Sequence, residues 1–306
     1  MERSGGQIAR TPTVSVVIAT YNRARLLKET IESVLKQTFQ DFELIVVDDG
    51  STDDTEKVLK SYGDRVRYFR QENRGPSAAR NLGIRHARAS WISIQDSDDI
   101  CAPNHLKTLF GFVQKNRDCG MVFANGSYLD DPGPKGKTII PREKSKRMAE
   151  RGVELADLFS TSIVRLQAAL LSKEAFLSIG GLDETLRICM DLDLGFRFFM
   201  RFPVAYLDEV VFFYRRHEGN IGRNQELRLL ENLRVIEKLV QDFPSATKIL
   251  GHKQIDRRKA YRYYRLAKSR WKAGEKDGAR NALRQAVFLR PFFLKYRLYQ
   301  LLGAIF

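Results

Sequence analysis

The first hundred residues alternate between short apolar runs and longer segments that carry a helical stripe. Four runs are rich in β-branched or aromatic residues and too short for helices, and they predict strands over 14–19, 42–47, 66–69 and 91–94. The segments between them predict helices over 23–37, 51–62 and 76–89. Apolar strands that alternate with helices are typical of a mostly parallel sheet covered by helices, so we expect an α/β fold.

A second region is expected to begin near Gly222. Between residues 130 and 146 the chain is rich in Pro, Gly and Lys, which predicts a mobile loop. From Leu227 onward, apolar residues recur at helical spacing. We therefore predict two domains, an α/β domain over 1–222 and a basic helical extension over 223–306.

The positive charge of the chain lies mostly in its C-terminal part. The 306 residues have a formal net charge of +15, and residues 253–306 hold 15 Lys and Arg against 3 Asp and Glu. A basic chain is typical of a nucleic-acid-binding protein. Because the excess belongs to the tail and the body carries no nucleic-acid motif, we do not expect nucleic acid as a partner. A protein that binds nucleic acid through its tail remains an alternative function.

Cysteine use and hydropathy favour a reducing compartment. Cys101, Cys119 and Cys189 are far apart and form no C-x-x-C pair, which argues against a disulfide scaffold and against a zinc site. The first twelve residues lack an apolar signal segment, and no run reaches the roughly 18 apolar residues of a membrane span. We expect a cytoplasmic protein that can bind peripherally to the inner face of a membrane.

The tail predicts a helical hairpin with an amphipathic end. Small and apolar residues in 260–291 fit the offsets of a single tetratricopeptide-type repeat, and one repeat cannot bury its own face, so the hairpin is expected to dock on the body. Aromatic and basic residues are mixed in 287–306, which is typical of an interfacial helix on anionic lipid. The alternative is that the aromatic residues pack on the protein and the Lys and Arg form a solvated face.

Acidic side chains follow two of the predicted strands. Asp48 and Asp49 follow the second strand, and Asp96, Asp98 and Asp99 follow the fourth. Ligands of open α/β sheets bind at the carboxyl ends of the strands, where five carboxylates would repel one another unless a cation lay among them. Oxygen ligands suit Mg²⁺ or Mn²⁺ and not zinc. The alternative, that these residues cap the next helices, does not explain Asp96 and Asp98 on either side of a serine after a buried strand.

Six blocks of sequence occur in order between residues 13 and 222. They lie at 14–53, 71–84, 96–99, 180–184, 191–193 and 214–217. One block alone would be a weak signal, but the six in this order resemble the family 2 glycosyltransferases, and the third matches the D-x-D element of that family. The tail lies outside the resemblance.

The resemblance implies a Rossmann-like GT-A fold and the transfer of a sugar from a nucleotide-diphosphate donor to a hydroxyl group with inversion. It implies that Ala19, Thr20 and Tyr21 would line the base and ribose of the donor. Asp49 would accept a hydrogen bond from the base, and Asp96 would lie near the ribose and the metal.

The resemblance also implies a metal ligand and a general base. Asp98 would be the principal ligand of a Mn²⁺ or Mg²⁺ cofactor, which stabilises the charge of the departing diphosphate as a Lewis acid. Asp191 would take the proton of the acceptor hydroxyl, a contribution of about 10²–10⁴-fold. The family often has Glu before this aspartate, where this chain has Met190. Asp193 is the competing choice of base, or it braces the neighbouring loop.

Four further residues have two interpretations each. His217 lies in a block that the family uses near the diphosphate, so it is either a phosphate or metal ligand or a structural histidine. Arg80 either reaches the donor or pairs with one of the carboxylates. Asp183 and Glu184 either contact the acceptor or cap their own loop.

We therefore expect an inverting glycosyltransferase of surface polysaccharide or glycoconjugate synthesis. The default donor is a UDP-sugar, and the acceptor is a glycan or a lipid-linked molecule, with an anionic membrane surface as a further partner. The other alternative is a catalytically inactive sugar-nucleotide binder. Only Met190 hints at it, and the intact Asp96, Asp98 and Asp191 argue against it.

Overall fold

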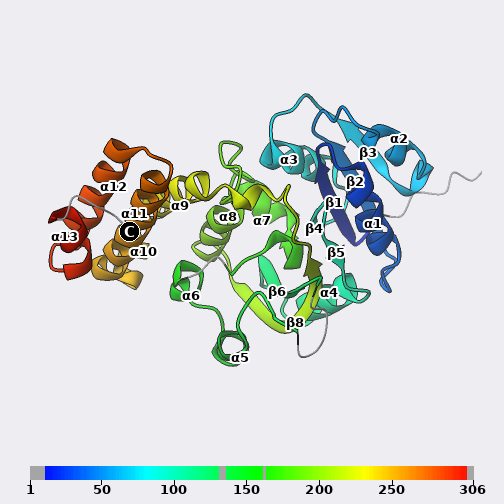
Figure 1. The fold of residues 1–306 in the computed structure, drawn as a ribbon. Coiled ribbons are helices and arrows are strands. Elements are labelled where there is room, and N and C mark those ends of the chain that lie inside the picture. Colours follow the sequence, from blue (N-terminus) through cyan, green and yellow to red (C-terminus); the bar gives the residue numbers. More distant parts are fainter. Residues whose placement is uncertain (1–10, 131–135, 161–162, 302–306) are drawn as a thin grey trace, which may run out of the picture.

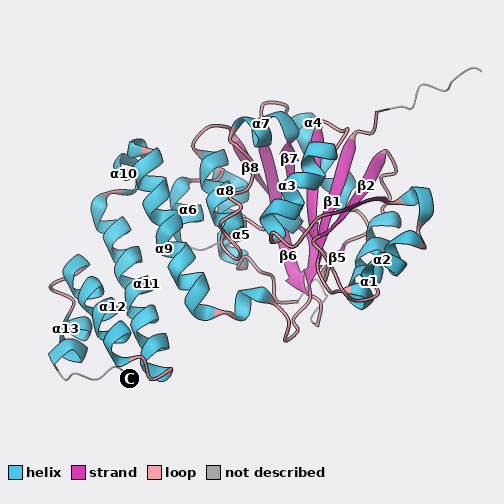
Figure 2. Ribbon diagram, turned by 90° about the horizontal axis from the view of Figure 1, so that it is seen from above, coloured by secondary structure: helices cyan, strands magenta, loops and turns pink. Residues whose placement is uncertain are grey.

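The computed structural model describes residues 11–130, 136–160 and 163–301. Its body is built on one eight-stranded sheet with the strand order β3-β2-β1-β4-β7-β6-β8-β5 (Figures 1 and 2). The strands are β1 (Val14–Thr20), β2 (Phe42–Asp48), β3 (Arg67–Arg70), β4 (Trp91–Asp96), β5 (Ile100–Cys101), β6 (Met121–Tyr128), β7 (Ala169–Ser172) and β8 (Val204–Tyr214).

Helices cover both faces of this sheet. They are α1 (Ala24–Leu35), α2 (Thr55–Lys60), α3 (Pro76–His86), α4 (His105–Lys115), α5 (Arg142–Arg151), α6 (Leu155–Ser160), α7 (Lys173–Ser178) and α8 (Met190–Phe199). Successive side chains of a strand point to opposite faces, and accordingly Val17 of β1 belongs to one hydrophobic cluster while Val16 and Ile18 belong to another. The predicted α/β class is confirmed.

The strand register brings the polar ends of three strands to one edge of the sheet. Strands β3, β2, β1 and β4 are parallel neighbours. Ala19 near the end of β1 pairs with Val47 on β2 and with Asp96 on β4. The side chains that follow these strands therefore lie close together, although up to about eighty residues separate them in the sequence.

The second half of the sheet is mixed. Strand β7 runs antiparallel to β4 and β6, β6 and β8 are parallel, and β5 is antiparallel to β8. The expectation of a mostly parallel sheet thus holds for the first four strands. The predicted loop over 130–146 is wrong at its end, because α5 begins at Arg142; residues 131–135 of that loop lie outside the described residues.

The C-terminal region is helical, with α9 (Gln225–Asp242), α10 (Pro244–Leu250), α11 (His252–Lys272), α12 (Lys276–Leu289) and α13 (Leu294–Leu301). Helices α11 and α12 form the predicted hairpin, which turns at Gly274 with a φ of 84°. Small buried residues bring the two helices close; they include Ala260, Ala267, Ala279 and Ala286. None of the described helices is long and apolar enough to cross a bilayer.

Helix α9 packs on both parts of the molecule (Figure 1). Its residues Val235, Ile236 and Leu239 belong to a core cluster of the body, whereas Leu229 belongs to the cluster of the extension. The division at residue 222 stays a prediction, and it falls just before the helix that joins the two parts.

Candidate active site

A pocket of about 370 Å³ opens at the carboxyl edge of the parallel strands. All six residues expected to bind the donor line it: Ala19, Thr20, Tyr21, Asp49, Arg80 and Asp96. These residues come from α3 and from the carboxyl ends of β1, β2 and β4, so the strand register is what brings them together. We refer to this hollow as the donor pocket.

Asp49 is fixed by the segment that precedes α3. Its Oδ1 accepts hydrogen bonds from Nε2 of Gln71 at 2.7 Å and from the amide of Arg74 at 2.9 Å, and its Oδ2 accepts one from the amide of Gly75 at 2.8 Å. Gly75 has a φ of 94°, which a residue with a side chain rarely adopts. One lone pair of Oδ2 remains available for a ligand in the pocket.

Three carboxylates at the end of β4 and directly after it lie within reach of a single cation. Oxygen atoms of Asp96, Asp98 and Asp99 come within 4.8 Å of one another. Burial raises the pKa of Asp99 well above its ordinary value, and the neighbouring Asp96 and Asp98 raise it further. Oδ2 of Asp99 is buried and has no hydrogen-bond partner among the described residues. An all-oxygen set that repels itself fits a hard divalent cation such as Mg²⁺ or Mn²⁺.

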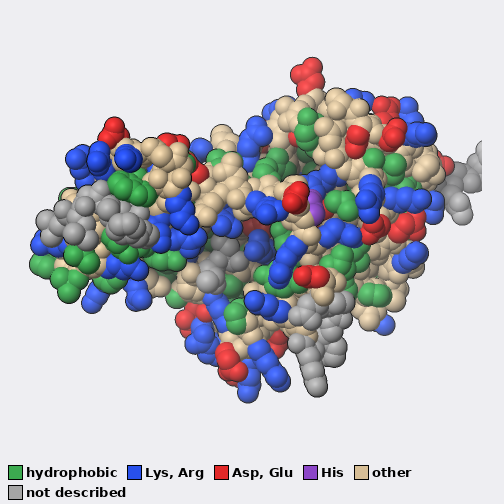
Figure 3. Space-filling view, viewed as in Figure 1, with side chains coloured by type: hydrophobic (Ala, Val, Ile, Leu, Met, Phe, Trp, Pro, Cys, Tyr) green, Lys and Arg blue, Asp and Glu red, His purple; other side chains and the backbone are tan. Residues whose placement is uncertain are grey.

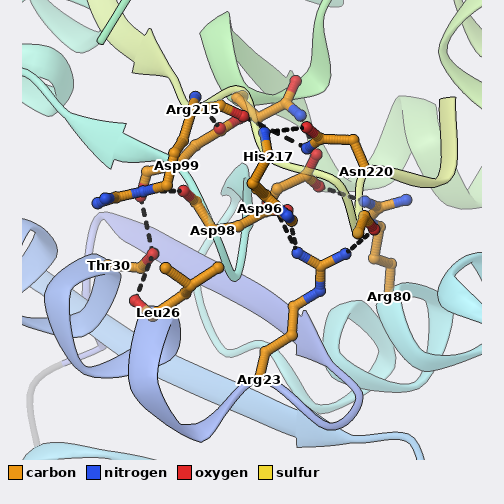
Figure 4. Close-up of polar contacts among 12 residues, drawn as sticks. Arg23, Leu26, Thr30, Arg80, Asp96, Asp98, Asp99, Arg215, His217 and Asn220 are labelled. Carbon is orange, nitrogen blue, oxygen red and sulfur yellow. Dashed lines mark hydrogen bonds and ion pairs between the residues drawn. The ribbon is translucent and has the colours of Figure 1, made fainter. Parts of the chain in front are cut away.

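Cationic and polar side chains surround the carboxylates (Figure 4). Arg23 forms an ion pair with Asp98, and Nε2 of His217 lies 2.8 Å from Oδ2 of the same carboxylate. Arg80 pairs with Oδ1 of Asp96, and Gln167 donates to Oδ2. The structure therefore brings His217 to Asp98 and Arg80 to Asp96, so that each can hold its carboxylate or face a ligand.

Asp191 lies in a second hollow, a cleft of about 910 Å³ between the body and the extension. It sits in the first turn of α8, where the helix dipole favours a carboxylate. Burial raises the pKa of Asp191 to about 6, although the guanidinium groups of Arg165 and Arg80 act in the opposite direction. A carboxylate with such a pKa is suited to take a proton near neutral pH.

The donor pocket and this cleft adjoin. Tyr214, Asn220 and Gly222 line both of them. The carboxylate of Asp96 also raises the pKa of Asp191, so charges in one hollow are felt in the other. A molecule in the donor pocket can therefore meet a second molecule that enters beside Asp191.

The loop before α8 is held from α9. Glu231 is 6% exposed, and its carboxylate accepts hydrogen bonds at 2.8 Å from three successive backbone amides, those of Arg187, Ile188 and Cys189. These amides directly precede α8, so Glu231 fixes the approach to Asp191. Met190, where the family often has Glu, is buried at the start of the helix.

Asp193 and the two expected acceptor residues make structural contacts. Asp193 is 3% exposed and contacts Arg197 and Lys238, which fits the interpretation as a brace. Asp183 pairs with Lys238 at 2.6 Å and accepts hydrogen bonds from Thr185 at 2.5 and 3.0 Å. These bonds lower the pKa of Asp183 against the effect of burial.

Glu184 bridges two other segments. It pairs with Arg74 at 2.9 Å and accepts a hydrogen bond from Asn81 at 3.1 Å. Neither Asp183 nor Glu184 is among the residues that line the two hollows. The loop-capping interpretation fits the contacts of Asp183, whereas Glu184 links its loop to Arg74 and Asn81. The acceptor role of both residues stays a prediction without a geometric basis.

Sequence reasoning missed several polar residues of the site. They are Arg23, Arg165, Gln167 and Glu231, together with arginines of α9 and α11. Arg23 directly follows the Thr-Tyr-Asn end of β1, so its position could have suggested it. The others carry no motif and meet the site only through tertiary packing.

Comparison with known proteins agrees with this architecture. Residues 15–176 match the model of glycosyl transferase family 2. An uncharacterized glycosyltransferase of Rickettsia prowazekii is 32% identical over 225 residues, which cover 72% of this chain and 69% of that protein.

Two solved structures share the fold. S. aureus TarS 1–349 has a TM-score of 0.69 with 18% identity over 95% of this chain and 88% of that one, and it has also been solved with UDP-GlcNAc. The mannosyltransferase PcManGT of Pyrobaculum calidifontis, in complex with GDP-Man and Mn²⁺, has a TM-score of 0.62 with 19% identity over 96% of this chain and 85% of that one. The α/β sheet, its ligand edge and these matches together establish that the chain belongs to glycosyl transferase family 2 and is a glycosyltransferase of the GT-A fold.

Proposed function

We propose that the chain is an inverting, metal-assisted glycosyltransferase that moves a sugar from a nucleotide-diphosphate donor to a hydroxyl group. The observation that carries the proposal is the adjacency of two hollows. One is lined by the six expected donor residues, and the other by the carboxylate of Asp191. A single displacement needs a leaving group and a base on opposite sides of one carbon atom, and adjoining hollows offer that arrangement.

The residues of the chain have distinct tasks in this proposal. Asp49 would hold the nucleobase of the donor, and Asp96 and Asp98 would be the ligands of a Mn²⁺ or Mg²⁺ ion. When bound, that ion supplies positive charge to the departing diphosphate. Asp191 accepts the proton of the acceptor hydroxyl, which its pKa of about 6 allows at neutral pH. Arg80 interacts electrostatically with both Asp96 and Asp191, and it contributes a further positive charge to the donor side.

A UDP-sugar is the favoured donor, and surface polysaccharide or glycoconjugate synthesis is the favoured setting. The neighbours of the fold bind UDP-GlcNAc in one case and GDP-Man with Mn²⁺ in the other, which supports a nucleotide sugar and a divalent metal. The intact Asp191 and its raised pKa favour an enzyme over an inactive sugar-nucleotide binder.

Peripheral binding to an anionic membrane is part of the proposal. Phe288, Phe292 and Leu294 are at least 80% exposed, whereas Tyr296 is buried and stacks on Tyr264 with ring centroids 5.0 Å apart. Some aromatic residues of 287–306 thus pack on the protein and others are exposed. Phe306 lies outside the described residues. Vesicle flotation compares the wild type with Phe288→Ser/Phe292→Ser, which leaves the packed tyrosines in place. Equal flotation of the two proteins would refute peripheral membrane binding.

The donor site is tested by calorimetric titration of UDP, GDP and dTDP, each with and without Mn²⁺. We expect metal-dependent binding of one nucleotide that is lost in Asp98→Ala. Asp118→Ala, at an exposed aspartate outside both hollows, is the matched control and should bind as the wild type does. If no nucleotide binds to the folded wild type, the proposed function is wrong.

A further inference from the structure

The cleft beside Asp191 is lined by more arginines than any neutral sugar requires. Six lie along it: Arg165, Arg216, Arg223, Arg228, Arg262 and Arg265. The acidic residues of the same lining are Asp191 and Glu218. In Figure 3, Lys and Arg side chains gather on the facing sides of the extension and the body. The cleft is therefore strongly positive.

The long helices of the extension supply three of these arginines. Arg228 lies on α9, and Arg262 and Arg265 lie on α11 at a spacing that places them on one face of the helix. Burial lowers the pKa of Arg262, and the like charges of Arg265 and Arg228 lower it further. The three guanidinium groups thus stay together at an electrostatic cost.

The cleft arginines are short of anionic partners. Arg216 pairs with Asp130 at 3.8 Å, but the other five make no ion pair within the described ranges 11–130, 136–160 and 163–301. The Nε atom of Arg165 is buried and has no hydrogen-bond partner there. By contrast, Arg270 on α11 pairs with Glu226, and Arg280 on α12 pairs with Asp277. Ion pairs thus neutralise these two arginines outside the cleft, whereas Arg228, Arg262 and Arg265 form none among the described residues.

The donor does not account for these charges. The donor pocket has arginines of its own, namely Arg23, Arg80 and Arg187, and it contains none of the six that line the cleft. The cleft lies on the side of Asp191, where the second substrate enters. A guanidinium group binds phosphate or carboxylate through two parallel hydrogen bonds, and a concave positive surface concentrates anions.

We propose that the acceptor is an anionic glycan, whose phosphate or carboxylate groups bind Arg228, Arg262 and Arg265 and so bring a hydroxyl group to Asp191. This inference rests on the proposed function and names the substrate class of the same site. The helical extension is then an acceptor-binding element and not only a cap on the body.

The test measures binding of soluble oligosaccharide probes to the full-length protein. The probes are an oligomer of glycerol phosphate, an oligogalacturonate and a neutral dextran oligomer of similar length. The double variant Arg262→Gln/Arg265→Gln is compared with Arg280→Gln/Arg284→Gln on α12, which removes the same charge from exposed positions. Arg228→Gln, at an exposed side chain, provides a variant that does not disturb packing.

We expect one anionic oligomer to bind and the dextran to fail. Arg262→Gln/Arg265→Gln should weaken that binding by tenfold or more and Arg228→Gln by several-fold, while the α12 pair should change it less than twofold. The probe that binds, phosphate or carboxylate, identifies the anion. UDP or GDP binding should be equal in all variants.

Equal loss of affinity in the two double variants would overturn the inference, because the net charge of the protein would then explain the binding without a specific contact in the cleft. Tighter binding of a thymidine oligonucleotide than of either anionic oligomer would overturn it in favour of nucleic acid. If the wild type binds a nucleotide with Mn²⁺ but none of the anionic oligomers, this inference fails while the proposed function stands. If no nucleotide binds, the proposed function fails first.

Discussion

Replacing the carboxylate of Asp191 by an amide should stabilise the protein while it removes sugar transfer. Burial raises the pKa of Asp191 from its ordinary value of 3.8 to about 6, so the folded protein binds this proton more tightly than the unfolded chain does. As the pH rises through that window the folded state becomes less stable relative to the unfolded state, and the cost is complete above about pH 6. A difference of about two pKa units corresponds to about 3 kcal/mol, which solvent in the open cleft reduces to about 1–2 kcal/mol.

Urea unfolding of the wild type and Asp191→Asn between pH 4 and pH 8 measures this cost. We expect the variant to be more stable by about 1–2 kcal/mol at pH 8, and the difference should shrink toward zero as the pH falls to 4. At pH 8 the transfer activity of the variant should be lower than that of the wild type by about 10²–10⁴-fold or more, and this ratio should shrink below about pH 6, where Asp191 of the wild type becomes protonated. Asp193→Asn is the control on the same helix, because Asp193 pairs with Arg197 and Lys238. It should be less stable than the wild type by about 1–3 kcal/mol.

A stability difference that did not depend on pH would refute this reasoning. The same holds if Asp191→Asn were the less stable protein at pH 8. Either result would mean that the arginines near Asp191 compensate its charge fully, and that burial is not what prepares it to accept a proton.

Three further predictions follow from the contacts around the site. The kcat/KM of the wild type should decline tenfold per pH unit below about pH 6, as Asp191 becomes protonated; a flat profile down to pH 5 would exclude this group as the base. Glu231→Gln replaces an acceptor of backbone amides by an amide donor, so kcat should fall about 10–100-fold while nucleotide affinity, read by calorimetry, stays unchanged; an equal loss of both would indicate general unfolding. Arg258 is 8% exposed, and its guanidinium group lies 4.6 Å from the ring centroid of Phe159. Its three guanidinium nitrogens have no hydrogen-bond partner in the described part of the chain, and burial lowers its pKa to about 9. Arg258→Met should therefore raise the unfolding free energy by about 1–3 kcal/mol. The control Arg257→Met, at an exposed position, should leave the unfolding free energy unchanged. If Arg258→Met were less stable than the wild type, burial of this cation would not be the cost assigned to it.

The parallel half of the sheet could be predicted because its signals are local. Each strand from β1 to β4 is a short apolar run beside a helical stripe, and each ends in polar residues. The mixed half gives no such signal. Strand β8 is eleven residues long and pairs with β6 through shifts of register next to Asn125, and the direction of such a pairing depends on tertiary contacts.

The candidate site divides in the same way. Asp49, Asp96 and Asp98 lie at or directly after the ends of strands, so a rule about strand ends predicts their position. Arg165 lies just before a 3₁₀ turn, and Arg262 lies 71 residues beyond Asp191 on another helix. No local pattern distinguishes these arginines from surface arginines, because their role depends on which side chains the fold brings near them in space.

The bond between Glu231 and the loop before α8 bears on how such enzymes can be recombined. A chimera joined at residue 222 would take α8, which carries Asp191, from one parent and Glu231, whose carboxylate holds the loop before α8, from the other. Lys238, sixteen residues past that junction, would likewise be separated from Asp183 and Asp193. The smallest segment that can be transferred between relatives without breaking these contacts therefore extends at least through Lys238. Chimeras that exchange acceptor specificity should be joined after α9 and not before it.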